Sequence, residues 1–170
     1  MSKAILISIR PEWCELIALG AKTIEIRKTK PKIETPFKCY IYESSGNQRV
    51  GNENFNVYLK GKGRKKVIGE FVCDRIHRIA IIDDECVDVV DCNTACLSSR
   101  EILDYANGNL LYGWHISDLV IYDEPRELSY FCKPVECHRG LQKEECVGCW
   151  DCEIKRPPQS WCYVEESDNV

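Results

Sequence analysis

The chain has 170 residues, 44% of them hydrophobic, which is enough to bury roughly 70% of the unfolded surface in one core. Its formal net charge of −4 argues against a constitutive, non-specific coat on nucleic acid. No apolar run approaches the roughly 18 residues of a membrane span, and the first residues lack a signal-peptide core. We therefore expect one cytoplasmic domain over residues 1–170, with no membrane partner.

The charge is strongly segregated along the chain. Residues 22–66 hold 12 Lys and Arg against 4 Asp and Glu, a local charge of +8, and the other residues hold 11 against 23, a charge of −12. This pattern predicts a cationic site on an otherwise acidic body.

The first 28 residues predict a strand, a short helix and a second strand. Residues 3–9 form the first strand, and the helix starts at Arg10-Pro11 because proline costs no needed donor at the first helical position. Gly20 ends the helix as a C-cap residue, and residues 22–28 form the next strand.

In the strand at 22–28, side chains alternate between two faces. Ile24 and Ile26 are expected to face a core, which leaves Thr23, Glu25 and Arg27 together on the opposite face. A carboxylate and a guanidinium on one face make this the first candidate for a binding site.

The rest of the chain is predicted to be mostly β. The acidic stretch from residue 83 to 91 looks like a surface loop, and Gly69 marks a bulge or a close backbone approach. Ser98 to Glu101 fits a capping box that opens a helix. His115, in an alternating segment, is expected to be half-buried and hydrogen-bonded. Further strands are expected at 37–43, 65–82, 112–122 and 161–164. Many strands with two short helices favour a small α+β barrel over a doubly wound sheet.

The motif Gly20-x-Lys22-Thr23-x-Glu25-x-Arg27, directly after a helix, resembles the signature of the ASCH domain, a member of the PUA-like superfamily. Residues 113–119 and 156–164 are similar to segments of phage-associated and bacterial ASCH proteins. The resemblance implies an α+β fold, a small PUA-like β-barrel flanked by short helices, here with a C-terminal Cys-rich loop. It also implies a cleft that accepts RNA or a modified nucleoside.

Some ASCH proteins are amidohydrolases of acylated cytidines that use a lysine, a threonine and a distant glutamate. Lys22 matches that lysine, Glu25 stands where the threonine is expected, and Glu70 is a candidate for the distant glutamate. The resemblance thus leaves open an amidohydrolase or a ribonuclease, with Lys22 and Glu25 as catalytic residues. Because a nearby carboxylate stabilises an ammonium, the residues themselves favour a charged Lys22 that binds over one that attacks.

For a binding site, we expect Lys22, Arg27 and Lys28 to contact phosphate or base edges. Glu25 would accept from an exocyclic amine or orient Arg27, and Trp13 would stack on a base. A plain surface ion pair around Glu25 is the alternative without function. A third hypothesis is a protein-interaction module of a mobile element, which binds through the acidic surface.

Twelve cysteines in a chain without an export signal favour reduced thiols or metal ligands over disulfides. Cys137, Cys146, Cys149 and Cys152 have spacings that suit a structural Zn²⁺ stapling an insertion at 132–152, with Cys132 and His138 as alternative ligands. A [4Fe–4S] cluster on the Cys-x-x-Cys-x-x-Cys run is the less favoured alternative.

Overall fold

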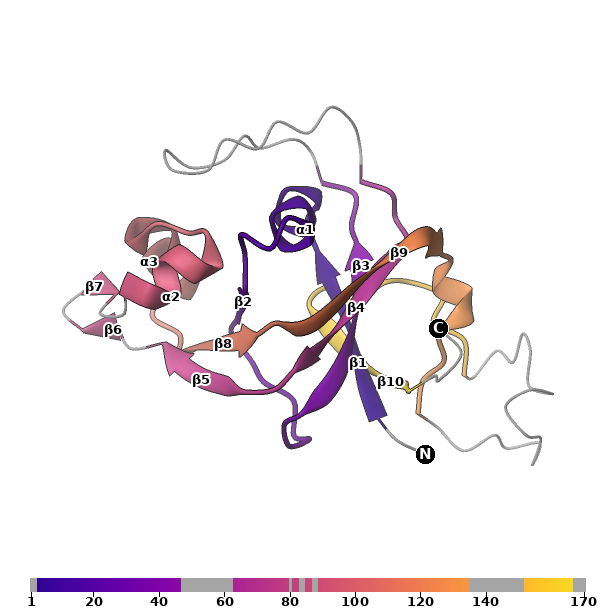
Figure 1. Cartoon of the computed structure of the whole chain (residues 1–170). Coiled ribbons are helices and arrows are strands. Elements are labelled where there is room, and N and C mark those ends of the chain that lie inside the picture. Colours follow the sequence, from indigo (N-terminus) through magenta and orange to yellow (C-terminus); the bar gives the residue numbers. More distant parts are fainter. Residues whose placement is uncertain are drawn as a thin grey trace.

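A computed structural model of the chain describes residues 3–46, 63–79, 81–82, 85–86, 89–134 and 152–166. These residues form a mixed α+β fold with two main sheets and a few short helices (Figure 1). The five-stranded sheet has the order β10 (Trp161–Glu165), β1 (Lys3–Ile9), β3 (Phe37–Glu43), β4 (Val67–Cys73) and β9 (Ser117–Arg126). The three-stranded sheet has the order β2 (Ile24–Arg27), β8 (Leu111–His115) and β5 (Ile76–Ile79), and β6 (Ile81–Ile82) pairs with β7 (Glu85–Cys86).

The helices are short and lie beside the sheets. They are α1 (Pro11–Ala18), α2 (Val89–Ala95), α3 (Ser99–Ala106) and the 3-10 turn η1 (Leu128–Tyr130). In Figure 1, α2 and α3 gather beside the free end of the β5–β8 pair, whereas η1 lies at the far end of β9. No helix in the described part of the chain is long and apolar enough to cross a bilayer.

The two sheets are joined by a bent pair of strands. The antiparallel β4–β9 ladder continues, past a break at Ile116, as the antiparallel β5–β8 ladder. The register shifts next to Gly69, where a Cβ atom would lie 2.4 Å from the carbonyl oxygen of Val120. Gly69 is thus a point of close backbone approach at a bulge, as predicted.

A closed barrel is not confirmed by the strand pairing. Among the described strands, no backbone ladder joins β2 to β1 or β10. Side chains bridge this position instead: Arg27 of β2 donates to the Ser8 carbonyl of β1 and to Ser160 Oγ, just before β10. We call this position the seam.

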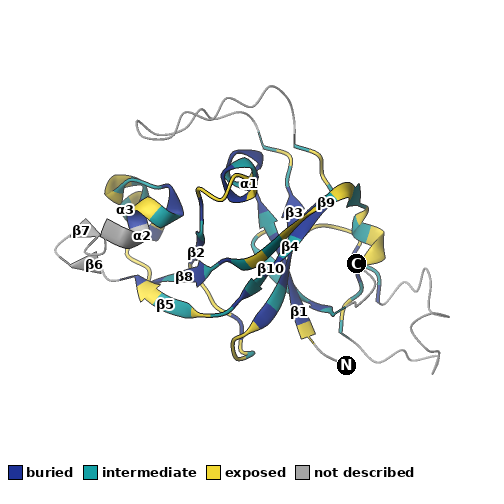
Figure 2. Cartoon of the chain, in the orientation of Figure 1, coloured by how far each residue is buried: buried dark blue, intermediate teal, exposed yellow. Residues whose placement is uncertain are grey.

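The core consists of several buried clusters, and strand β2 is buried along its whole length (Figure 2). Ile24 and Ile26 face a small cluster that includes Ala95 of α2 and Ile102 of α3, which confirms the predicted alternation. A larger cluster between α1 and the main sheet has Trp114 at its centre, fully buried against Phe37 and Trp161.

The sequence predicted the start of helix α3 but missed helix α2. The capping box is confirmed, since Ser98 Oγ accepts from the Glu101 amide at 3.3 Å and Glu101 Oε2 accepts from the Ser98 amide at 2.9 Å. The surface loop predicted over the acidic stretch 83–91 is wrong, because β7 lies within it at Glu85–Cys86 and helix α2 begins at Val89. Cys92 and Ala95 of this helix are buried beneath β2, so packing stabilises a segment with poor local helix propensity.

Candidate functional site

A cavity of about 400 Å³ lies between α1, β2, α3 and the segment before β10. Its walls combine buried charges, two aromatic rings and several polar groups. They include Lys22, Glu25 and Arg27, which the sequence predicted to share one cleft. The lining residues are Ser8, Ile9, Arg10, Trp13, Lys22, Glu25, Ile26, Arg27, Ser44, Leu97, Glu101, Tyr105 and Gln159.

The turn after α1 places Lys22 at the bottom of this cavity. Gly20 adopts a φ of +73°, the left-handed conformation that ends a helix, and the amides of Ala21 and Lys22 both donate to the carbonyl of Leu16. The next amide, of Thr23, donates to the Thr94 carbonyl in α2 at 2.8 Å. A segment some 70 residues away thereby fixes the start of the site strand.

Lys22 is almost completely buried, with 2% of its surface exposed. Its ammonium donates to the carbonyls of Ile24 and Ala95, both at 2.8 Å, and lies 3.3 Å from Glu25 Oε2. Since an ammonium has three N–H donors, these three acceptors use all of them. Lys22 therefore has no N–H left for a further acceptor, and what it contributes to the cavity is its charge and the position it imposes on Glu25.

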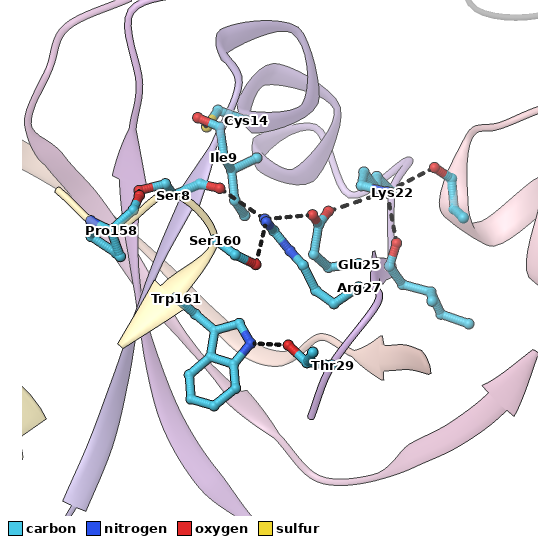
Figure 3. Close-up of polar contacts among 12 residues, drawn as sticks. Ser8, Ile9, Cys14, Lys22, Glu25, Arg27, Thr29, Pro158, Ser160 and Trp161 are labelled. Atoms are coloured by element: carbon cyan, nitrogen blue, oxygen red, sulfur yellow. Dashed lines mark hydrogen bonds and ion pairs between the residues drawn. The ribbon is translucent and has the colours of Figure 1, made fainter. Parts of the chain in front are cut away.

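Glu25 is held between two cations. Its Oε1 lies 2.8 Å from Arg27 Nη2, and its Oε2 faces Lys22 (Figure 3). Each carboxylate oxygen has two lone pairs, so the group still has acceptor capacity toward the cavity that it lines. The result is a rigid acceptor suited to an N–H or O–H of a bound molecule.

Arg27 crosses the seam with its guanidinium. Nη2 donates to the Ser8 carbonyl at 2.8 Å and Nη1 donates to Ser160 Oγ at 3.3 Å, and these contacts converge in Figure 3. Its Nε is buried and has no hydrogen-bond partner in the described structure. Below it, Trp161 Nε1 donates to Thr29 Oγ1 at 3.0 Å across the same seam.

Burial has the larger effect on the charge of Lys22. Removal from water lowers the pKa of Lys22, and the adjacent carboxylate of Glu25 offsets this only in part. The motif from Gly20 to Arg27 predicts the effect of Glu25 but not the burial of Lys22, because depth of burial depends on distant parts of the fold.

Two aromatic side chains from different helices line the cavity. Trp13 of α1 is partly buried, with the Lys22 ammonium 5.4 Å from its ring centroid, so it packs on the core and also faces the site. Tyr105 of α3 was not predicted, although an aromatic beside the buried Ile102 and Ala106 on an amphipathic helix was the available signal. Lys28, a predicted ligand contact, is exposed, with its ammonium 5.1 Å from the Tyr105 ring centroid.

Glu70 does not line this cavity, so the structure does not place it as the distant acid of the site. Its carboxylate contacts Lys38 at 3.3 Å and accepts from the Tyr122 hydroxyl at 2.5 Å. Burial, followed by the hydrogen bond to Glu70, raises the pKa of Tyr122. This pair lies by a second hollow, of about 680 Å³, that follows β9 from Val120 and holds none of the predicted site residues.

His115 is half-buried and hydrogen-bonded, as predicted: its Nδ1 lies 2.6 Å from Asp74 Oδ1. Burial acts to raise the pKa of Asp74, but the hydrogen bond and charge of His115 outweigh it and lower that pKa. The pair does not line the cavity.

The predicted metal ligands Cys137, His138, Cys146 and Cys149 lie outside the described residues. The two described candidates are neighbours: Cys132 forms an isolated antiparallel bridge with Glu153, and the Lys133 amide donates to the Cys152 carbonyl at 2.7 Å. Within the described ranges, no group of three or more His, Cys, Asp or Glu side chains is arranged to hold a metal ion.

Comparison with known proteins identifies the fold. No protein-family model matches the chain, and no curated protein matches it by sequence. The crystal structure of ASCH from Zymomonas mobilis is similar over 96% of this chain and 88% of that one, at 20% identity and a TM-score of 0.58. A serine-to-alanine variant of that protein matches with a TM-score of 0.60 at 20% identity, covering 96% of this chain and 89% of the other. A tyrosine-to-phenylalanine variant matches with a TM-score of 0.61 at 21% identity, covering 97% and 92%. The resemblance seen in the motif from Gly20 to Arg27 is thus confirmed at the level of the fold, and this chain folds as an ASCH domain protein does.

Proposed function

We propose that the cavity around Lys22, Glu25 and Arg27 binds RNA or a nucleoside-like ligand. The observation that carries this proposal is the buried row of three charges along one wall of a cavity of about 400 Å³. Burying charges is costly and contributes little net stability, so such a row is explained better by a ligand than by the fold.

The groups on the walls match the chemistry of a nucleoside. Glu25 offers an acceptor for ring N–H or exocyclic amino groups, and Arg10 and Arg27 offer positive charge toward phosphate or carbonyl oxygens. Trp13 provides an aromatic surface beside these charges. The same set of groups would not suit an apolar ligand, because such a ligand would displace water from the charged groups of the cavity and offer them no hydrogen-bond partner in return.

Binding is tested by fluorescence anisotropy with single-stranded, structured and modified RNA at several salt concentrations. If three to five phosphates are contacted, the logarithm of the affinity should fall against the logarithm of salt with a slope of about −2 to −3.5. The absence of any salt-sensitive binding to all three kinds of RNA would refute the proposal.

Two variants locate the site. Glu25→Gln should weaken binding while retaining the shape of the side chain, and Lys28→Ala should reduce the salt slope by about 0.7 if its ammonium contacts one phosphate. Arg75→Ala is the matched control: both cations are exposed and neither lines the cavity, but the Lys28 ammonium lies 5.1 Å from the ring centroid of the lining residue Tyr105, whereas Arg75 pairs with Asp74 away from it. Equal losses in the control and in Lys28→Ala would show that net charge, and not this site, governs binding.

A second candidate is hydrolysis, either of an acylated pyrimidine or of RNA. The observation that favours it is the lowered pKa of Lys22, because a lysine must lose its proton to act as a base or nucleophile. Product formation that disappears in both Lys22→Ala and Glu25→Gln, with folding retained, would establish it. Turnover that persists in both variants would exclude these residues as catalytic.

We also propose a structural Zn²⁺ in the Cys-rich segment. The spacing of Cys137, Cys146, Cys149 and Cys152 supports it, and the pairing beside Cys132 brings the two ends of the segment together. A [4Fe–4S] cluster on these cysteines is the alternative, and metal analysis of the purified protein distinguishes it from zinc.

A further inference from the structure

Tyr105 is a large aromatic side chain whose position is not accounted for by packing in the apolar core. It lies on α3, whose buried residues are Ile102 and Ala106, and it retains 41% of its surface exposed. Its ring belongs to none of the three buried apolar clusters in the described structure. It does line the cavity that holds the buried charges.

The surroundings of Tyr105 connect it to the charged row. Burial raises the pKa of its hydroxyl, and the charges of Arg27, Glu25 and Arg10 also act on it, which places the phenol within electrostatic reach of the cavity charges. The exposed ammonium of Lys28, which is not among the lining residues, lies 5.1 Å from the ring centroid, and we call this position the rim. Tyr105 therefore contacts the rim and also lines the cavity that holds Glu25.

The helix that carries Tyr105 is well anchored. The capping box at Ser98 and Glu101 fixes its start, and Asn107, in the left-handed conformation, ends it with its amide donating to the Leu103 carbonyl at 3.0 Å. Ile102 and Ala106 attach the same helix to the cluster beneath β2. A ring held on a fixed helix loses little conformational entropy when a ligand stacks on it.

We propose that Trp13 and Tyr105 form an aromatic clamp for one unpaired nucleobase, and that Tyr105 determines specificity for single-stranded over double-stranded nucleic acid. This inference rests on the proposed function and names the form of the ligand. Trp13 reaches the cavity from α1 and Tyr105 reaches it from α3, so a planar group that enters meets aromatic surface from both helices.

The size of the cavity supports a single base. A volume of about 400 Å³ is near the lower end for ligand sites and is suited to one nucleoside. A base inside a duplex exposes neither its faces nor its pairing edge, whereas an unpaired base can be splayed out and stacked on aromatic side chains. With the base inside, its pairing edge meets Glu25, and the phosphate stays at the rim near Lys28.

The test compares Tyr105→Ala, Tyr105→Phe and Tyr130→Ala in anisotropy titrations with a short single-stranded RNA and with its duplex. Loss of one stacking ring should weaken single-strand binding of Tyr105→Ala roughly 5- to 150-fold. Tyr105→Phe should stay within about threefold of the parent, because the ring is retained. Tyr130→Ala is the matched control, since this tyrosine is 73% exposed and lines only the hollow along β9.

Two further readouts separate stacking from other roles. The salt slope of Tyr105→Ala should equal that of the parent, because no phosphate contact is removed. The parent should bind the duplex more weakly than the single strand, and Tyr105→Ala should narrow that difference. Circular dichroism checks that each variant is folded.

Several results would overturn the clamp. Tyr105→Ala that binds the single strand as tightly as the parent would exclude it while leaving the proposed function intact. Equal losses in Tyr105→Ala and Tyr105→Phe would assign the effect to the hydroxyl and refute stacking. A parent protein that binds no RNA in any form would instead refute the proposed function itself, and this inference with it.

Discussion

Glu25→Gln tests whether the buried charges behave as one unit. In the parent, the carboxylate lies 3.3 Å from Lys22 Nζ and 2.8 Å from Arg27 Nη2, and all three residues are buried. Glutamine keeps the shape and one carbonyl acceptor but removes the negative charge. Two buried cations are then left with no counter-charge between them.

The expected cost follows from this geometry. Removing one partner of a buried ion pair costs about 3–5 kcal/mol, because the remaining charge stays buried without compensation. The glutamine oxygen can still accept from Arg27, which places the expected loss near the lower end, at about 3 kcal/mol. A domain of this size is usually stable by about 5–15 kcal/mol, so the variant should still fold.

Urea unfolding followed by circular dichroism measures this loss. Asp104→Asn is the matched control, since its ion pair with Arg100 is of the i,i+4 type and both side chains are exposed. We expect the control to change the unfolding free energy by no more than about 0.5 kcal/mol. A double variant with Lys22→Met should lose less than the sum of the single losses, by about 1 kcal/mol or more.

A loss below about 1 kcal/mol in Glu25→Gln would refute the reasoning, because that is the size expected of a solvent-screened surface pair. Strict additivity with Lys22→Met would refute it independently, since the two residues would then not depend on each other.

Three other predictions concern the fold and the thiols. Gly69→Ala should lower the unfolding free energy by about 1–3 kcal/mol, since its Cβ would lie 2.4 Å from a backbone oxygen, and a change below about 0.5 kcal/mol in urea unfolding would contradict that contact. Burial, with the charge of Asp74, raises the pKa of Cys73 to about 12, so the folded state keeps a proton that the unfolded chain releases above about pH 8.5. The contribution of this thiol to the unfolding free energy is therefore complete below pH 8.5 and falls by up to about 1.4 kcal/mol per pH unit above it. When urea unfolding of the parent and of Cys73→Ala is measured under reducing conditions between pH 7.5 and 10, the unfolding free energy of the variant should fall less steeply with pH. Metal analysis of anaerobically purified protein should find about one zinc per chain, whereas brown protein with iron and sulfide would indicate the [4Fe–4S] cluster, and neither metal with all thiols titratable would exclude both.

The local parts of the fold were predictable from the sequence. Strands β1 and β3 have the predicted bounds, 3–9 and 37–43, because each is a short run rich in aliphatic or aromatic residues that Pro or polar residues flank. The capping box and the glycine that ends α1, Gly20, were likewise predictable from short sequence motifs. So was the shared face of Glu25 and Arg27, which depends only on strand geometry.

The features that were missed depend on distant parts of the chain. Helix α2 has β-branched and acidic residues and no local signal strong enough to predict it, but Ala95 and Cys92 bury against the underside of β2. The same helix covers Lys22 and accepts from its ammonium through the Ala95 carbonyl, and it is the burial, not this hydrogen bond, that lowers the pKa of the lysine. Tyr105 became a candidate only when the fold placed α3 at the cavity.

The seam makes one edge of the site adjustable. Elsewhere in the sheet, hydrogen bonds fix neighbouring strands about 4.8 Å apart, whatever side chains they carry. Between β2 and its neighbours β1 and β10, side chains set the spacing instead: the Arg27 guanidinium reaches the Ser8 carbonyl and Ser160 Oγ, and Trp161 Nε1 donates to Thr29 Oγ1. Because the Ser8 acceptor is a backbone carbonyl, substitutions at Arg27, Ser160 or Thr29 are the ones that change these contacts, and they can widen or narrow the cavity while every backbone ladder stays in register.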